Sequence, residues 1–372
     1  MTIFRLILIA ALGLVSQRAT AQTAPHHGGF IDREVLTRFL NDAEDKGFKG
    51  IVAVSGPDGT IFSRGFGAAD TMGTAYSPQT VVDIASVTKQ FTGAAILTLF
   101  EDGKLSLNDR LDRFFPDVPT DKAAITVHQL LTHTAGLPHG LGEDKEIIGK
   151  QDYIARAFAT PLILRPGERY EYSNVGFTLA AAIIEQVSGQ SYEDYLYEAL
   201  WKPAGMVATG YLRPNWNDRP MQTHAAPIEG FHAQQELLEK ADGKFWHLTG
   251  NGGLLSTAEN ILKWHRALLK NTVLSDESKA LLFEPHVPED ADGVYHYGYG
   301  WSVVPDYLGK KLVWHNGGSY FATADFWRFP AQGTAFFIAS HEGDIPTFMV
   351  ADGIAAILLG KTPRPVSRQA EE

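Results

Sequence analysis

Strand patterns occur at both ends of this chain, with helical patterns between them. Near the start, residues 51–55 and 60–62 flank a Gly-Pro-Asp-Gly turn, which predicts a β-hairpin. Strands at both ends of the chain with helices between them predict an α+β fold, in which one antiparallel sheet is built from both termini and flanked by helices. Beyond residue 250, the predicted strands are Tyr297–Val304, Lys311–His315, Tyr320–Phe329 and Thr334–Ser340.

Helices are predicted beside the sheet and in the middle of the chain. Apolar residues recur at helical spacing over 31–46, and further helices are predicted from Phe177 to Ser188 and from Pro346 to Leu359. Between about 104 and 246 the pattern is mostly helical and is broken by Pro and Gly, with an irregular excursion over 208–246. We therefore expect a mostly helical subdomain beside the sheet.

These elements fit one domain, and no internal repeat is present. The last residues, 361–372, are Pro-rich and charged, which is typical of a disordered tail. The expected domain spans 22–360, with an α/β part at about 30–103 and 247–360 and a helical part at about 104–246.

The first 21 residues have the pattern of a secretory signal peptide. Arg5 precedes a short apolar run, Leu6–Val15, and Ala19-Thr20-Ala21 forms a small-x-small cleavage site before Gln22. The apolar run is too short to span a bilayer well, so a permanent membrane anchor is not expected. We expect a bacterial protein that is exported to the periplasm or secreted.

Composition excludes several classes of site. The chain has 372 residues and no cysteine, so it has neither disulfides, nor a cysteine nucleophile, nor cysteine-ligated metals. The formal charge of −11 becomes −13 once the two arginines of the signal peptide are removed, and no basic run is present, which argues against nucleic-acid binding. The 13 histidines show no His-Glu-x-x-His spacing, so we expect no metal site.

Ser86 is followed three residues later by Lys89, within an apolar segment of helical spacing. Residues i and i+3 share a helix face, so the hydroxyl and the amine are expected to lie side by side. A neutral amine there can take the serine proton, and the start of a helix favours a developing oxyanion. The alternative for this tetrad alone is a surface lysine on a helix with a capping serine.

Two further motifs follow along the chain. Tyr172-Ser173-Asn174 precedes a predicted helix, where the alternative is that Asn174 caps the helix and Tyr172 is buried. The run from His315 to Gly318 ends a predicted strand, and its glycines would allow a ligand to approach the strand edge. His341-Glu342-Gly343 and the histidines at 26 and 27 match the same short pattern and are expected to be structural or incidental.

In this order, Ser-x-x-Lys, Tyr-x-Asn and His-x-Gly resemble the serine β-lactamase and penicillin-binding protein superfamily. The tyrosine of the second motif is similar to the group of class C β-lactamases, D,D-carboxypeptidases, D-aminopeptidases and family VIII esterases. The resemblance covers about residues 31–360 and implies the β-lactamase/transpeptidase-like fold. Other segments similar to that group are 125–138, 250–258 and 297–301.

The resemblance implies a role for each motif residue. Ser86 would form an acyl-enzyme, with Lys89 and Tyr172 on its proton path; which of the two takes the proton stays open. Asn174 would hold the substrate amide. The oxyanion hole would use the backbone N–H groups of Ser86 and Gly318. The implied substrate-binding residues are Asn174, His315, Asn316 and Gly317. The implied mechanism needs no metal or organic cofactor.

His315 departs from the class C pattern, which has lysine at this place. Because histidine titrates near neutrality, we expect a charge that is only partial and that rises below pH 6, so β-lactam hydrolysis is in doubt. His133 is another candidate base, but we favour a buried, hydrogen-bonded structural histidine, because the Ser-Lys-Tyr set already supplies a base. The aromatic group Phe231, Phe245, Trp246 and His247 either rims a pocket or packs in the core.

The predicted function is that of an exported serine hydrolase that cleaves an amide or ester bond, of the D,D-peptidase, esterase or β-lactamase type. Its partner would be a small-molecule or peptide substrate with an ester or amide carbonyl. The alternative is a penicillin-binding sensor or a catalytically silent binding protein of the same fold. The oligomeric state stays open.

Overall fold

The computed structural model describes residues 32–70, 72–212, 234–320, 322–341 and 345–367. Asp32–Glu372 form one compact unit. The predicted signal peptide, Phe231 and the last five residues of the predicted tail lie outside the described residues.

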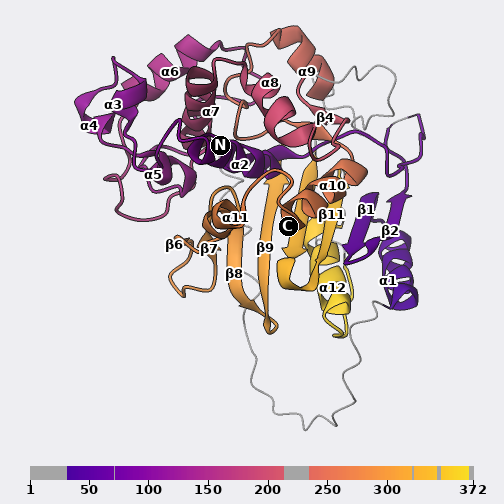
Figure 1. Ribbon diagram of the computed structural model, residues 1–372. Coiled ribbons are helices and arrows are strands. Elements are labelled where there is room, and N and C mark those ends of the chain that lie inside the picture. Colours follow the sequence, from indigo (N-terminus) through magenta and orange to yellow (C-terminus); the bar gives the residue numbers. More distant parts are fainter. Residues whose placement is uncertain (1–31, 71, 213–233, 321, 342–344, 368–372) are drawn as a thin grey trace. The chain divides into compact units, whose positions relative to one another are not determined.

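One antiparallel sheet joins the two ends of the described chain (Figure 1). Its strand order is β2-β1-β11-β10-β9-β8-β7-β6, so the N-terminal hairpin pairs with the last strand of the chain. This arrangement confirms the predicted α+β fold and the sheet built from both termini. The strands are β1 (Gly50–Gly56), β2 (Gly59–Phe66), β6 (Val287–Pro288), β7 (His296–Tyr297), β8 (Ser302–Tyr307), β9 (Lys310–Gly318), β10 (Thr323–Phe329) and β11 (Thr334–Ser340).

The sequence-based prediction of a single strand over 297–304 is wrong. The chain turns between β7 and β8, and Gly300 adopts a φ of +81° in this turn. A Cβ at Gly300 would lie 2.4 Å from the backbone oxygen of Lys89. The glycine thus allows the turn to cross the start of helix α2 at a distance that another residue would not permit.

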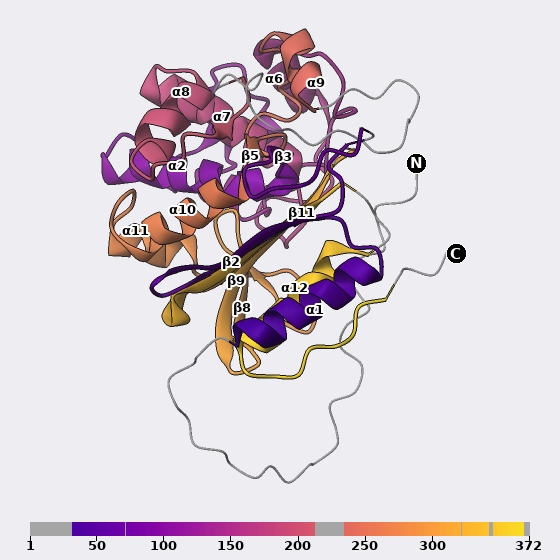
Figure 2. The same ribbon diagram turned by 90° about the vertical axis from the view of Figure 1, so that its right-hand side faces the viewer.

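Helices cover both faces of the sheet (Figure 2). On one face, α1 (Arg33–Asp45) and α12 (Thr347–Leu358) lie side by side; on the other, α10 (Ala258–Leu269) packs on β1 and β11. The alternation along β1 explains this, because Val52 and Val54 join the core of the first face and residues 51 and 53 that of the second.

Most helices of the described residues lie between β2 and β6, beginning with α2 (Lys89–Glu101), which packs against α7. A small sheet, in the order β3-β5-β4, was not predicted, because its strands have only two residues each. The remaining elements are β3 (Val82–Asp83), the 3-10 helix η1 (Ala85–Thr88), α3 (Leu111–Phe114), α4 (Thr120–Ala123), α5 (Val127–Leu131), α6 (Lys150–Ala159), α7 (Asn174–Ser188), α8 (Tyr192–Leu196), the π-helix η2 (Tyr197–Trp201), β4 (Thr209–Gly210), α9 (Gln234–Ala241), β5 (Leu255–Ser256), α11 (Asp276–Leu282) and the 3-10 helix η3 (Pro330–Gln332).

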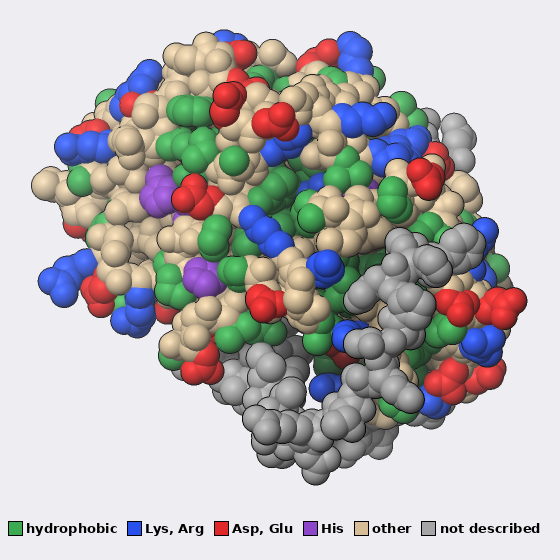
Figure 3. Space-filling view, turned by 60° about the horizontal axis from the view of Figure 1, so that its bottom comes forward, with side chains coloured by type: hydrophobic (Ala, Val, Ile, Leu, Met, Phe, Trp, Pro, Cys, Tyr) green, Lys and Arg blue, Asp and Glu red, His purple; other side chains and the backbone are tan. Residues whose placement is uncertain are grey.

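Within the described ranges, no helix combines the length and apolar character needed to cross a membrane. The same part of the chain holds no cluster of three or more His, Asp or Glu side chains suited to a metal ion. On the face drawn in Figure 3, acidic and basic side chains of the described residues are interspersed.

Candidate active site

Ser86 lies in a tight turn that leads into α2. It belongs to η1, and the α-helix proper begins only at Lys89, whereas the sequence pattern predicted a continuous helix. The preceding residue, Ala85, adopts a φ of +45°. An alanine in this left-handed region is strained, so the surrounding structure must hold the turn in place.

Lys89 is fully buried and directed at Ser86. Its Nζ lies 3.1 Å from Ser86 Oγ and donates to the backbone oxygen of Asn251 at 2.6 Å. Burial lowers the pKa of Lys89 well below its ordinary value, while the negative charge of Asp144 acts weakly in the opposite direction. The structure therefore brings together the predicted hydroxyl and amine, and it favours the neutral form of the amine.

Tyr172 lies against the same lysine. Its ring centre is 4.8 Å from Lys89 Nζ. Burial raises the pKa of Tyr172 above its ordinary value, and a hydrogen bond with the Ser86 hydroxyl opposes this only in part. The tyrosine is thus a protonated phenol near neutral pH.

The loop that follows α5 holds Tyr172 in place. The backbone N–H of Ser173 donates to His133 Nδ1 at 3.0 Å, and the N–H of Glu171 donates to the His133 backbone oxygen at 2.8 Å. The imidazole ring lies 4.3 Å from the Tyr172 ring, centre to centre. His133 is buried and hydrogen-bonded, as predicted, and burial lowers its pKa well below the ordinary value.

Asn174 starts α7, but it is not the cap of that helix. The cap is Ser173, whose side chain accepts the N–H of Gly176, so the capping alternative for Asn174 is wrong. Its Oδ1 atom is buried and has no hydrogen-bond partner among the described residues. An unpartnered buried oxygen beside Tyr172 is suited to accept an N–H group from a ligand.

His315 lies in the site, but the expectation of partial charge is wrong. The side chain is only 4% exposed; Nε2 accepts the Tyr297 hydroxyl at 2.9 Å, and Nδ1 donates to the Asn316 backbone oxygen at 2.5 Å. Burial, assisted by the neighbouring Lys89, lowers the pKa of His315 to about 3. The alternation of β9 turns this residue inward and leaves Asn316 and Gly318 exposed.

The end of β9 meets the Ser86 turn at Gly317. A Cβ at this position would lie 2.7 Å from the backbone nitrogen of Ser86 and 2.7 Å from the oxygen of Ile84. Only a glycine fits there without displacing the turn. Gly318, the next residue and the last of β9, was predicted as the second oxyanion donor, and it stays a prediction.

The sequence analysis missed three residues at the site. Asp83, three residues before Ser86, accepts the backbone N–H of Ala85 at 2.8 Å. Asn251 orients Lys89 through its backbone oxygen. Asp144 exerts its charge on both Lys89 and Asp83. The Asn251 segment resembled the superfamily, which was a signal; no local pattern indicated the other two.

The acidic loop carrying Asp144 reaches the end of β9. Glu143 Oε2 accepts the Tyr320 hydroxyl at 2.6 Å, and Tyr320 follows directly on Gly318 and Ser319. Burial raises the pKa of Asp144. The rim of the site thus carries carboxylates in this loop.

The aromatic group near 245 packs in the core. Phe245 and Trp246 are both buried members of the main hydrophobic cluster, and the Phe245 ring contacts the Tyr211 ring at a tilt of 40° with ring centres 5.1 Å apart. His247 is buried as well. For these residues, the core-packing alternative holds.

Comparison with known proteins assigns the family. The beta-lactamase family profile matches residues 35–361. The chain belongs to the beta-lactamase family. It is 27% identical over 306 residues to penicillin-binding protein 4* of Bacillus subtilis, a match that covers 77% of this chain and 66% of that protein. This beta-lactamase-family chain spans 53–66% of the length of the first curated relatives that it matches.

Solved structures agree with this family assignment. The octameric penicillin-binding protein homologue from Pyrococcus abyssi has a TM-score of 0.78 at 26% identity, and the match covers 90% of this chain and 78% of that one. The D-amino acid amidase from Ochrobactrum anthropi SV3, complexed with L-phenylalanine amide, has a TM-score of 0.70 at 25% identity and covers 83% and 91%. Membership of the beta-lactamase family confirms the predicted fold and superfamily, and it implies serine-hydrolase-type activity.

Proposed function

We propose that this chain is an exported serine hydrolase that cleaves ester or amide bonds through an acyl-enzyme on Ser86. The observation that carries the proposal is the contact between Ser86 Oγ and Lys89 Nζ, 3.1 Å apart, with the lysine fully buried. Burial lowers the pKa of Lys89 and so favours the neutral amine, whose lone pair can accept the hydroxyl proton.

The proposed proton path depends on the lowered pKa of Lys89 and the raised pKa of Tyr172. Burial favours the neutral form of both groups, so Lys89 is the base and the Tyr172 phenol is the acid in the resting site. Ser86 Oγ attacks the substrate carbonyl while its proton passes to Lys89. The Tyr172 hydroxyl then donates a proton to the leaving amine or alcohol and recovers one from Lys89, and water hydrolyses the acyl-enzyme by the reverse path.

Backbone and amide groups would bind the substrate. The N–H groups of Ser86 and Gly318 would stabilise the oxyanion, each with a contribution of about 3 kcal/mol to the barrier. The free Oδ1 of Asn174 would accept an N–H of the acyl portion.

Charge indicates the substrate class. Burial disfavours the charged forms of Lys89 and His315, and the charge that acts on Lys89 from nearby is that of the Asp144 carboxylate. A substrate carboxylate would be repelled there, whereas a neutral or ammonium-bearing substrate would not. We therefore favour an esterase or amidase over a β-lactamase or D,D-carboxypeptidase, in line with the similarity to a D-amino acid amidase.

Mass spectrometry with matched probes tests this proposal. The wild type should form an adduct with a fluorophosphonate and turn over p-nitrophenyl butyrate and D-phenylalanine amide, whereas Ser86→Ala should do neither. Benzylpenicillin should react far more slowly. A stable penicillin adduct without ester or amide turnover would favour the sensor, and the absence of any Ser86 adduct would favour a silent binding protein.

Export is tested separately. In a bacterial host, the processed chain should be recovered from the periplasm or the medium with Gln22 as its first residue. An unprocessed chain that begins at Met1 in the cytoplasm would contradict the signal-peptide proposal.

A further inference from the structure

We infer that Asp83 is a positioning residue whose carboxylate links the strained turn before Ser86 to the chain after Gly318, and so fixes the separation of the two oxyanion donors. This inference rests on the proposed acyl-enzyme function, because the donors matter only if Ser86 is acylated. Neither the family resemblance nor the sequence motifs assigned a role to Asp83.

The carboxylate has one contact on each side of the site. Oδ1 accepts the backbone N–H of Ala85 at 2.8 Å, directly before Ser86. Oδ2 accepts the hydroxyl of Ser319 at 2.6 Å, directly after Gly318. The expected oxyanion donors are thus each one residue away from an atom that Asp83 holds.

Both linked segments need such support. Ala85 has a φ of +45°, in a left-handed region that is unfavourable for alanine, and its hydrogen bond to Asp83 offsets this strain. Ser319 follows the last residue of β9, where the sheet no longer fixes the chain. Its hydroxyl accepts the N–H of Ala322 at 3.2 Å, and its own N–H donates to the Ala322 oxygen at 2.9 Å. Asp83 therefore anchors a serine that is also hydrogen-bonded to Ala322.

Gly317 limits how closely the end of β9 can approach the turn before Ser86. Because its Cα hydrogens face the Ser86 nitrogen and the Ile84 oxygen, the β9 end and the turn already lie at the closest approach that a glycine permits. Packing at Gly317 prevents the two segments from moving closer, and the Asp83 link prevents them from moving apart.

The two contacts of Asp83 require a side chain with two acceptor oxygens. Asp83 is 1% exposed, and it accepts from an N–H and an O–H at the same time. An asparagine has one acceptor oxygen and would turn an N–H toward Ser319. Burial raises the pKa of Asp83 to about 6, the Ser319 and Ala85 hydrogen bonds oppose that rise, and the charge of Asp144 adds to it. The charge of Asp83 also acts on the Tyr211 phenol, where it adds to the rise in pKa caused by burial.

Loosening the link should affect the transition state more than substrate binding. The oxyanion forms only during the reaction, and a displacement of about 1 Å in such a site lowers the rate by about 100-fold. We expect Ser319→Ala to lower kcat by about 10- to 100-fold, with KM changed by less than about 3-fold, whereas Ser319→Thr, which keeps the hydroxyl, should recover most of the activity.

Two further readouts separate positioning from a merely structural role. The affinity of an alkyl boronic acid, which forms a tetrahedral adduct on Ser86, should fall in proportion to kcat/KM in Ser319→Ala. The acid limb of kcat/KM should also move to higher pH in this variant, because the lost hydroxyl lowered the pKa of Asp83. Asp83→Asn should have low activity at all pH values. Because asparagine does not titrate, the ionisation of Asp83 should be absent from the acid limb of its kcat/KM profile.

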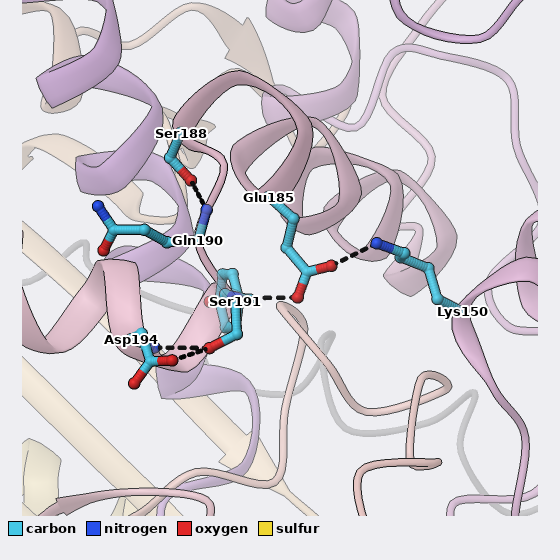
Figure 4. Close-up of polar contacts among 7 residues, drawn as sticks. Lys150, Glu185, Ser188, Gln190, Ser191 and Asp194 are labelled. Carbon is cyan, nitrogen blue, oxygen red and sulfur yellow. Dashed lines mark hydrogen bonds and ion pairs between the residues drawn. The ribbon is translucent and has the colours of Figure 1, made fainter.

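Ser191→Ala is the matched control. Ser191 Oγ–H donates to Asp194 Oδ2 at 2.7 Å, which is the same type of bond, at the exposed start of α8 (Figure 4). Loss of this cap should lower the urea midpoint of unfolding without changing kcat or the boronate affinity.

The outcomes separate the two proposals. If the fluorophosphonate does not label Ser86 in the wild type, the proposed function fails. If Ser86 is labelled but Ser319→Ala keeps its kcat, boronate affinity and pH profile, the positioning role of Asp83 is wrong. Ser319 is only half-buried, so Ser319→Ala is expected to fold. It therefore tests the positioning role even if Asp83→Asn does not fold.

Discussion

Nδ1 of His133 accepts the backbone N–H of Ser173 at 3.0 Å, and this bond joins the loop after α5 to the segment that carries Tyr172. It also fixes the tautomer: the ring proton must be on Nε2, which is buried without a partner among the described residues. His133 itself has a φ of +57°. The histidine thus positions Tyr172 through its ring and its backbone, and it is not placed to move the serine proton.

His133→Ala should therefore impair both stability and catalysis. The variant leaves the Ser173 N–H unpaired and removes the ring beside Tyr172, so the free energy of unfolding should fall by about 2–4 kcal/mol and kcat by at least about 10-fold. His133→Asn is the matched control, because asparagine tolerates a positive φ and keeps an acceptor. It should keep more activity than alanine. Equal kcat in the wild type and both variants would contradict the positioning role.

Lys89 and Tyr172 should act as one catalytic unit. Lys89→Ala and Tyr172→Phe should each lower kcat by about 100-fold or more, and the double variant should be little worse than the more damaged single variant, because both act on one proton path. Tyr197 is a half-buried tyrosine of η2, away from Ser86 in the sequence. Tyr197→Phe is therefore the control for removing a phenol hydroxyl elsewhere in the chain. If the losses of the two single variants multiply, the shared path is wrong.

Ser86 and Lys89 could be predicted as a pair because they are close in sequence. Spacing of three residues brings Ser86 and Lys89 together, and turn residues delimit the long strands well, so β11 (Thr334–Ser340) matches its prediction. Asp83 could not be identified, because its partner is 236 residues away in sequence. The strain at Ala85 was also hidden, because alanine gives no sign of a left-handed conformation.

The error at His315 has a different cause. His315 was predicted at the end of a strand, whereas β9 continues to Gly318 and the histidine lies within it. The charge of its side chain depends on which face of the sheet it occupies. A strand of alternating residues presents the same pattern whether the histidine points to solvent or inward, and here it points inward to the Tyr297 hydroxyl. Burial then decides the protonation state.

The revised expectation for His315 is a substrate preference that does not depend on pH. With a pKa of about 3, the imidazole is uncharged from pH 5 to 8, so the ratio of kcat/KM for an anionic and a neutral substrate of equal size should stay constant over that range. His315→Asn, which keeps an acceptor for Tyr297, should give the same flat profile. A ratio that rises below pH 6 in the wild type but not in this variant would show that His315 is protonated and meets the substrate.

Asp325 offers a test of burial that does not involve catalysis. This β10 residue is 2% exposed, and its Oδ1 accepts the indole N–H of Trp327 at 3.2 Å. Burial raises the pKa of Asp325 from 3.8 to about 6, and hydrogen bonds from Thr347 and Trp327 limit the rise. A group whose pKa is raised on folding binds a proton more tightly in the folded state, so ionisation destabilises the fold as the pH rises from about 4 to about 6.

Asp325→Asn removes this ionisation and keeps one acceptor oxygen. The variant should therefore gain stability relative to the wild type at pH 7.5, by at most about 3 kcal/mol, and the gain should shrink toward pH 4.5 as the wild-type carboxyl becomes protonated. Urea unfolding at the two pH values measures the difference, with Asp58→Asn in the exposed β1–β2 turn as the control for loss of a surface carboxylate. A gain of the same size at both pH values would mean that Asp325 ionises as easily in the folded as in the unfolded chain, and the effect of the substitution would then lie in packing and not in charge.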